Sequence, residues 1–255
     1  MPPPALPLFV FPAHLPGQAS DTGRNAEREG AMRHIVRHED WATVDLDTTA
    51  RHVLVRQDWL YVWSFGKKGH RWTPEEKHSF HREVDRTIWA HWSQRMRIRA
   101  RVNLATPRLP NDALRWHLAG LDLTLSFDVR QVVVGGQWKV FVAQEDPHIE
   151  EKPRARVDFG PKEIHLYSTD LLVQRARRFT GDTPKEGFSV HAHEFGHAIG
   201  NSDDEYQESS EFFQDTDSVM NIGQQLRPRH LELVCRTLAK MVKGCTFVAH
   251  QRPPL

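Results

Sequence analysis

Two histidines four residues apart, with a glutamate directly after the first of them, are the residues in this sequence best suited to carry chemistry. They are His193, Glu194 and His197. Side chains four residues apart share one face of an α-helix, so both imidazoles can bind the same metal ion. Glu194 is offset from that face by one residue, where its carboxylate reaches a water at the metal rather than the metal itself. The spacing predicts a metal site with a general base beside it, although an ordinary buried helix can have the same spacing.

The residues after His197 favour the metal site over the ordinary helix. Gly200 can take the left-handed conformation that ends a helix and reverses the chain. Asp203, three residues further on, would then return to the metal as a third ligand. Because Asp204 and Glu205 follow directly, a small shift of the turn would exchange these carboxylates. A different architecture would take the third ligand from a later segment, with Glu208, Glu211 and Glu232 as candidates.

The extended pattern resembles the metzincin clan of zinc peptidases, H-E-x-x-H-x-x-G-x-x-H, in which some members end with Asp. Here the pattern is filled by His193, Glu194, His197, Gly200 and Asp203. The resemblance implies that the two histidines and Asp203 bind Zn²⁺. It also implies that Glu194 is the catalytic general base that activates the metal-bound water for attack on a peptide bond.

A second part of the resemblance lies downstream. Residues 217–223 are similar to the Met-turn of the clan, with Met220 in the place of the methionine beneath the metal. Residues 227–241 carry apolar side chains at helical spacing and resemble the C-terminal helix of the clan. Ile222 stands where some members have a tyrosine near the reacting bond. Tyr206 is a candidate donor to the oxyanion instead, the alternative being a partly buried tyrosine with a structural role.

Capping signals and periodicity predict the elements that must hold this site. Thr73 and Pro74, with Glu76 after them, predict a capped helix start, and apolar residues at three-to-four spacing extend this helix to about Ser93. Alternation of apolar and polar residues predicts strands over 51–64, 95–102, 121–129 and 163–168.

Two further segments carry local signals. Residues 132–142 contain the Gly135-Gly136 pair and predict a β-hairpin. Residues 169–179 predict a helix before the histidine motif. The resulting order of helix, strands and helices predicts an α+β fold: a twisted mixed sheet with packed helices, an active-site helix, a Met-turn and a C-terminal helix.

The domain organisation follows from composition. Residues 1–30 combine prolines, small polar residues and charges without periodicity, and we expect a flexible segment. Residues 31–255 are expected to form a single metallopeptidase domain, with its catalytic core at about residues 160–245.

Charge and cysteine content exclude several classes of protein. Lys and Arg number 34 against 33 Asp and Glu, so no net field favours nucleic acid or an anionic membrane. The alternating arginines of residues 95–101 are therefore expected to line a solvated sheet face. No apolar run is long enough to span a membrane. Cys235 and Cys245 are too few for a disulfide framework, although a single bridge between them is possible.

Together these features predict a monomeric zinc-dependent endopeptidase that acts on a protein or peptide substrate. The alternatives are a zinc hydrolase of a non-peptide amide or ester, and an inactive, metal-stabilised binding module. Because the N-terminal segment lacks a basic region before its apolar patch, we expect no classical signal peptide. The protein would then be cytoplasmic, or an effector or toxin exported with a specialised secretion system as its partner.

Overall fold

The computed structural model describes residues 34–66, 69–105, 112–146, 148, 154–171, 174–176 and 185–251. The predicted flexible segment 1–30 lies outside these residues. The helices are α2 (Pro74–Trp92), α3 (Asp112–Leu118), α4 (Val190–Ala198) and α5 (Glu232–Met241), and the short 3₁₀ turns are η1 (Ser168–Leu171) and η2 (Pro228–Leu231). The strands are β1 (His34–His38), β2 (Thr43–Asp47), β3 (His52–Phe65), β4 (Met96–Val102), β5 (Asp122–Val132), β6 (Trp138–Gln144), β7 (Arg156–Asp158), β8 (Glu163–Tyr167), β9 (Gln174–Ala176), β10 (Lys185–Phe188) and β11 (Cys245–Gln251).

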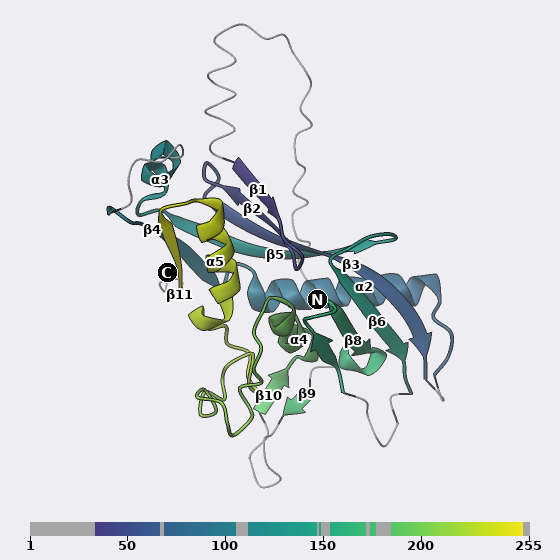
Figure 1. Cartoon of the computed structure of the whole chain (residues 1–255). Coiled ribbons are helices and arrows are strands. Elements are labelled where there is room, and N and C mark those ends of the chain that lie inside the picture. Colours follow the sequence, from purple (N-terminus) through teal and green to yellow (C-terminus); the bar gives the residue numbers. More distant parts are fainter. Residues whose placement is uncertain are drawn as a thin grey trace, which may run out of the picture.

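A twisted mixed sheet organises the described part of the chain (Figure 1). Its strand order is β11-β4-β5-β3-β6-β8-β7, and β2 pairs with the first half of β3 and with β1. The central strands β5, β3, β6 and β8 run parallel to one another. The remaining pairs of this sheet are antiparallel. β9 and β10 form a separate two-stranded sheet. This architecture confirms the predicted α+β class with a twisted mixed sheet.

The first helix begins as its sequence predicts. The Thr73 side chain accepts a hydrogen bond from the Glu76 backbone N–H at 3.2 Å, and the Glu76 carboxylate accepts one from the Thr73 N–H at 2.8 Å. This reciprocal capping box satisfies two backbone donors that a helix start leaves unpaired. The helix α2 ends at Trp92, and Ser93, its predicted approximate end, is the C-cap. The strands β3, β4, β5 and β8 overlap the four predicted strands.

The predicted hairpin at residues 132–142 is wrong. β5 and β6 both run parallel to β3, on opposite sides of it, and do not pair with each other. The connection between them passes closely over Asp58: Gln137 Oε1 accepts a hydrogen bond from the Asp58 N–H at 2.6 Å, and a Cβ on Gly136 would lie 2.9 Å from the Asp58 carbonyl oxygen. The glycine pair therefore allows a close crossing between strands, and the positive φ of both glycines does not signal a hairpin.

The predicted helix over residues 169–179 is also wrong where the structure describes it. Only the 3₁₀ turn η1 (Ser168–Leu171) is helical, and Gln174–Ala176 is the strand β9, which pairs with β10. The rest of the predicted helix lies outside the described residues.

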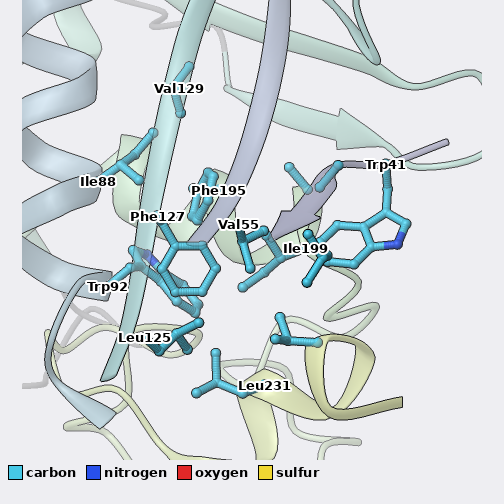
Figure 2. Close-up of a cluster of buried hydrophobic side chains, with 14 of the residues drawn as sticks. Trp41, Val55, Ile88, Trp92, Leu125, Phe127, Val129, Phe195, Ile199 and Leu231 are labelled. Carbon is cyan, nitrogen blue, oxygen red and sulfur yellow. The ribbon is translucent and has the colours of Figure 1, made fainter. Parts of the chain in front are cut away.

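Three helices cover one face of the sheet, where the core lies. The helix α2 packs on β5 and on α4, while α5 packs on β11. Figure 2 shows sheet side chains such as Val55 and Phe127 meeting Trp92 of α2 and Phe195 of α4. Among the described residues, no helix combines the length and the apolar character that crossing a membrane requires.

The opposite face of the sheet carries polar cross-strand pairs. Arg99 donates two hydrogen bonds to Asp122 at 2.7 and 2.8 Å, and Arg130 donates two to Asp58 at 2.6 and 2.8 Å. Arg99 lies on β4 with its side chain half-exposed. This confirms that the alternating arginines of β4 line a solvated sheet face. Cys235 and Cys245 are both free thiols.

Candidate metal centre

The helix α4, which carries the two histidines, is held at both ends by the fold. Ser189 caps its start, with Oγ accepting from the Ala192 N–H at 3.3 Å. The Trp92 indole N–H of α2 donates to the Ala192 carbonyl at 2.9 Å, and the Gln57 side chain of β3 donates to the Ala198 carbonyl at 2.9 Å. Both donors are buried. The sheet and α2 therefore fix the direction in which α4 presents its side chains.

Three atoms that could bind a metal ion converge beside α4. Asp204 Oδ1 lies 3.0 Å from His193 Nε2 and 3.1 Å from His197 Nε2, and the two Nε2 atoms are 3.3 Å apart. Each imidazole donates through its other nitrogen to a backbone carbonyl, His193 Nδ1 to Val219 at 3.0 Å and His197 Nδ1 to Asn201 at 2.7 Å. A carbonyl oxygen only accepts, so Nδ1 carries the proton in both rings and each Nε2 is left with its lone pair facing the other two donor atoms.

This donor set fits a small divalent cation. Two imidazole lone pairs and a carboxylate oxygen repel one another unless a proton or a cation lies between them. A tetrahedral zinc ion separates its ligand atoms by about 3.3–3.5 Å when its bonds are about 2.0–2.1 Å long. The three donor atoms, 3.0–3.3 Å apart, are close to that spacing. The Nδ1 hydrogen bonds to carbonyls are the outer-shell partners that metal-bound histidines usually have.

The carboxylate that the structure brings to the two histidines is Asp204, and not Asp203, which the sequence pattern favours. Asp203 is exposed and accepts a hydrogen bond from the Ser202 hydroxyl at 3.2 Å. The other carboxylates considered for this place are also outside the group: Glu205 is buried but paired elsewhere, and Glu208, Glu211 and Glu232 are exposed.

The turn after α4 explains the shift by one residue. Gly200 has the predicted positive φ, +98°, and ends the helix. Asn201 then stays at the helix end, because its backbone N–H and its side chain both donate to the Gly196 carbonyl at 3.2 and 2.8 Å. The return of the chain begins after Asn201, and Asp204 is the carboxylate that reaches the histidines.

The other oxygen of Asp204 is held from the opposite side. The Tyr206 hydroxyl donates to Asp204 Oδ2 at 2.7 Å, and the Gln207 side chain donates to it at 3.1 Å. Tyr206 accepts a hydrogen bond from Arg154 at 3.1 Å, and its ring stacks on the ring of His193. Burial, together with the hydrogen bond to Asp204, raises the pKa of Tyr206 well above its ordinary value, so the hydroxyl stays protonated and donates. In this structure Tyr206 orients Asp204, and its role as an oxyanion donor stays a prediction.

Glu194 lies beside this group at the edge of a depression. Glu194 is only 7% exposed, and its buried Oε2 atom has no hydrogen-bond partner within the described part of the chain. The depression has a volume of ≈ 550 Å³, and Glu194, Asp204 and Arg154 are among the residues that line it. Burial raises the pKa of Glu194 above its ordinary value, against the opposing influence of the two histidines. The site thus places an uncommitted carboxylate next to the three converging donors.

A tight turn, residues 218–223, packs against α4. The N–H groups of Asn221 and Gly223 both donate to the Ser218 carbonyl at 3.0 Å. Met220, at the centre of this turn, is buried and packs against Gly196 so closely that a Cβ there would lie within 2.1 Å of its sulfur. The turn also supplies the Val219 carbonyl that orients His193.

Several residues of this site carried no sequence signal. The carbonyl groups of Val219 and Asn201 are backbone atoms, which any residue type provides. Arg154 is one arginine among many, and only its position near Tyr206 gives it significance. The sequence indicated Asp204 as one of three consecutive carboxylates, but the conformation of the turn decides which of the three reaches the histidines.

A second group of possible ligands lies on β7 and β8, consisting of Asp158, Glu163 and His165. Arg156 lies 3.2 Å from His165 Nε2 through Nη2, and its Nε donates to Asp158 at 3.4 Å. This guanidinium already supplies the positive charge at that place, so the group is a weaker candidate than the one on α4.

No family model, curated protein or solved structure matches this chain.

Proposed function

We propose that this protein is a zinc-dependent endopeptidase with a metzincin-like site on α4. One observation carries the proposal: the Nε2 atoms of His193 and His197 and the Oδ1 atom of Asp204 converge within 3.3 Å of one another beside the unpaired carboxylate of Glu194. These three residues would hold the ion. Zinc supplies a Lewis acid at this place when it is bound.

Glu194 would act as the general base. Glu194 lines the depression beside the histidines, and its buried Oε2 atom has no hydrogen-bond partner among the described residues. It would take a proton from the attacking water and return it to the leaving amine, so one carboxylate serves both halves of the hydrolysis. His193 and His197 keep their orientation through the carbonyls of Val219 and Asn201.

The strand β7 favours a peptide over a small amide or ester as the substrate. It is the last strand of the sheet order, so among the described strands its outer edge has no partner. It packs against α4, and Arg154, Val157 and Asp158 place this segment along the hollows beside His197. An extended peptide can pair with a free strand edge through its backbone, which places a scissile bond beside the site without demanding one particular side chain.

The first experiment tests whether the chain hydrolyses peptides through Glu194. We expect the purified protein to bind one zinc ion and to cleave casein or a fluorogenic peptide library in a chelator-sensitive way. Glu194→Gln should keep its zinc and lower kcat/KM by about 100- to 10,000-fold, the range for loss of a general base.

Glu208→Gln is the matched control, because Glu208 is exposed and lies outside the group. It should leave both zinc content and activity unchanged. Full activity of Glu194→Gln would overturn the role of Glu194, and cleavage of small esters without cleavage of any peptide would redirect the proposal to a different substrate class.

A further inference from the structure

We infer that Arg229 and His230, directly before α5, hold both ends of the loop 201–205 and thereby position Asp204 for binding a divalent cation. The inference rests on the proposed metal site, and it assigns a positioning role to two residues that do not touch that site. The proposal is carried by hydrogen bonds at the two ends of this loop.

The carboxyl end of the loop is held through Glu205. Arg229 donates two hydrogen bonds to the Glu205 carboxylate, Nε to Oε1 at 2.7 Å and Nη2 to Oε2 at 2.8 Å. His230 accepts from the Arg227 N–H through Nδ1, so its Nε2 carries the proton that is donated to Glu205 Oε1 at 3.0 Å. Glu205 is 4% exposed. A bidentate guanidinium pair in a buried place fixes both distance and orientation.

The amino end of the loop is held through Asn201. Its side-chain amide donates to the His230 carbonyl at 3.1 Å. The Asn201 carbonyl is the acceptor that orients His197. The same two residues before α5 therefore contact the residue that orients one histidine and the residue next to Asp204.

The backbone of Glu205 is fixed as well. Its N–H donates to the Met220 carbonyl at 2.9 Å, and its carbonyl accepts from the Asn221 side chain at 3.0 Å. Asp204 precedes this anchored residue directly, so the anchored peptide determines where its carboxylate points. A ligand held in place before the ion arrives loses less conformational freedom on binding.

Arg229 also contacts two residues outside the loop 201–205, Asp215 and Phe212. Its Nη2 also donates to Asp215 Oδ2 at 2.7 Å, and Arg227 donates to the two Asp215 oxygens at 2.6 and 2.8 Å. The Arg229 guanidinium lies over the ring of Phe212 at 4.0 Å. Because Asp215 and Phe212 hold the Arg229 guanidinium in place, Arg229 in turn holds the Glu205 carboxylate in place.

The test measures metal affinity in variants of the full chain. Arg229→Gln should weaken zinc binding by about 10- to 100-fold in a competition titration with a chromophoric chelator, the range found when a partner of a metal ligand is lost. Removing a positive charge would by itself strengthen cation binding. Weaker zinc binding therefore cannot be explained by the lost charge.

The matched control is Arg236→Gln. Arg236 has a 63% exposed side chain, and its ion pair among the described residues is a 3.7 Å contact with Glu232. It should leave zinc affinity unchanged. Arg229→Lys, which keeps the charge but loses the paired hydrogen bonds, should fall between the wild type and Arg229→Gln, and it serves as the test if Arg229→Gln does not fold.

Two further measurements separate positioning from stability alone. The visible absorption of the Co²⁺-substituted protein should change in Arg229→Gln, because the Asp204 oxygen no longer holds its place. Thermal unfolding of the metal-free variants gives the stability loss separately. A lower Tm with unchanged zinc affinity and an unchanged Co²⁺ spectrum would overturn the inference.

The outcome for the wild type distinguishes this inference from the proposed function. If the wild type binds zinc but hydrolyses no peptide, the endopeptidase proposal fails and the affinity comparison still decides the positioning role. If the wild type binds neither zinc nor Co²⁺, both proposals are overturned.

Discussion

Asp203 and Asp204 are neighbouring carboxylates in different surroundings. Burial opposes ionisation of Asp204, but its close contacts with His193 and His197 and the hydrogen bond from the Tyr206 hydroxyl outweigh it and hold the pKa of Asp204 well below its ordinary value. The Asp203 side chain is exposed and contacts its neighbour Ser202. At the scale of single residues, the candidate site therefore depends on which of two identical side chains the turn directs inward.

This difference gives a direct comparison between two isosteric changes. Asp204→Asn should weaken zinc binding by more than about 100-fold, because loss of a ligand costs more than loss of a partner of a ligand. Asp203→Asn should bind zinc as the wild type does. Metal content after gel filtration and a chelator competition titration measure both. Equal weakening by the two changes, or weakening by Asp203→Asn alone, would restore Asp203 as the third ligand.

At the scale of elements, the turn 218–223 and the helix α4 act as one unit. The turn places the Met220 side chain against Gly196 and the Val219 carbonyl against His193. Gly223 closes the turn, and a Cβ there would lie within 2.1–2.5 Å of the Asp217 backbone. Backbone atoms cannot move aside as the end of a side chain can.

We therefore expect Gly223→Ala to lower the free energy of unfolding by at least about 1 kcal/mol, because an added methyl in a packed place forces the backbone to shift. Zinc affinity should fall with it, since the Val219 carbonyl moves. Chemical denaturation and the chelator titration measure the two effects. Gly160→Ala is the control, because a Cβ at Gly160 meets nothing within 4 Å. Wild-type stability of Gly223→Ala would contradict the close packing of the turn.

At the scale of the whole molecule, ion pairs join segments that are far apart in the sequence. Asp122 of β5 pairs with Arg99 of β4, and Asp215 joins the loop before the turn to the residues before α5. Hydrogen bonds from Arg99 lower the pKa of Asp122 to about 2. Those from Arg227 and Arg229 lower the pKa of Asp215 to about 2.

These shifts predict the direction in which pH changes stability. A carboxylate whose folded-state pKa lies below its unfolded value of about 4 stabilises the fold fully above that value, and the stabilisation is lost as pH falls toward about 2. The free energy of unfolding of the metal-free protein should therefore decrease between about pH 4 and pH 2. Asp215→Asn should flatten part of this decrease, as measured by urea denaturation at each pH. An unchanged pH dependence in Asp215→Asn would contradict its coupling to the arginines.

Local features of the fold were predictable from the sequence because they depend on neighbours along the chain. The Thr73 capping box, the alternating side chains of β4 and β5 and the positive φ of Gly200 are all set by the local backbone conformation and by residues close in the sequence. The glycine pair at residues 135–136 shows the limit of such signals. It permits a sharp change of direction, but the partner strands decide whether the result is a hairpin or a crossing over β3.

The same division holds for the candidate site. The sequence alone determined that His193, Glu194 and His197 lie together on one helix, because their spacing matches the period of the helix. Only the tertiary structure decided that Asp204 joins them. The distance from α4 to the returning chain depends on contacts of Asn201 and Glu205 with residues near position 230, and such long-range contacts leave no periodic pattern in the sequence.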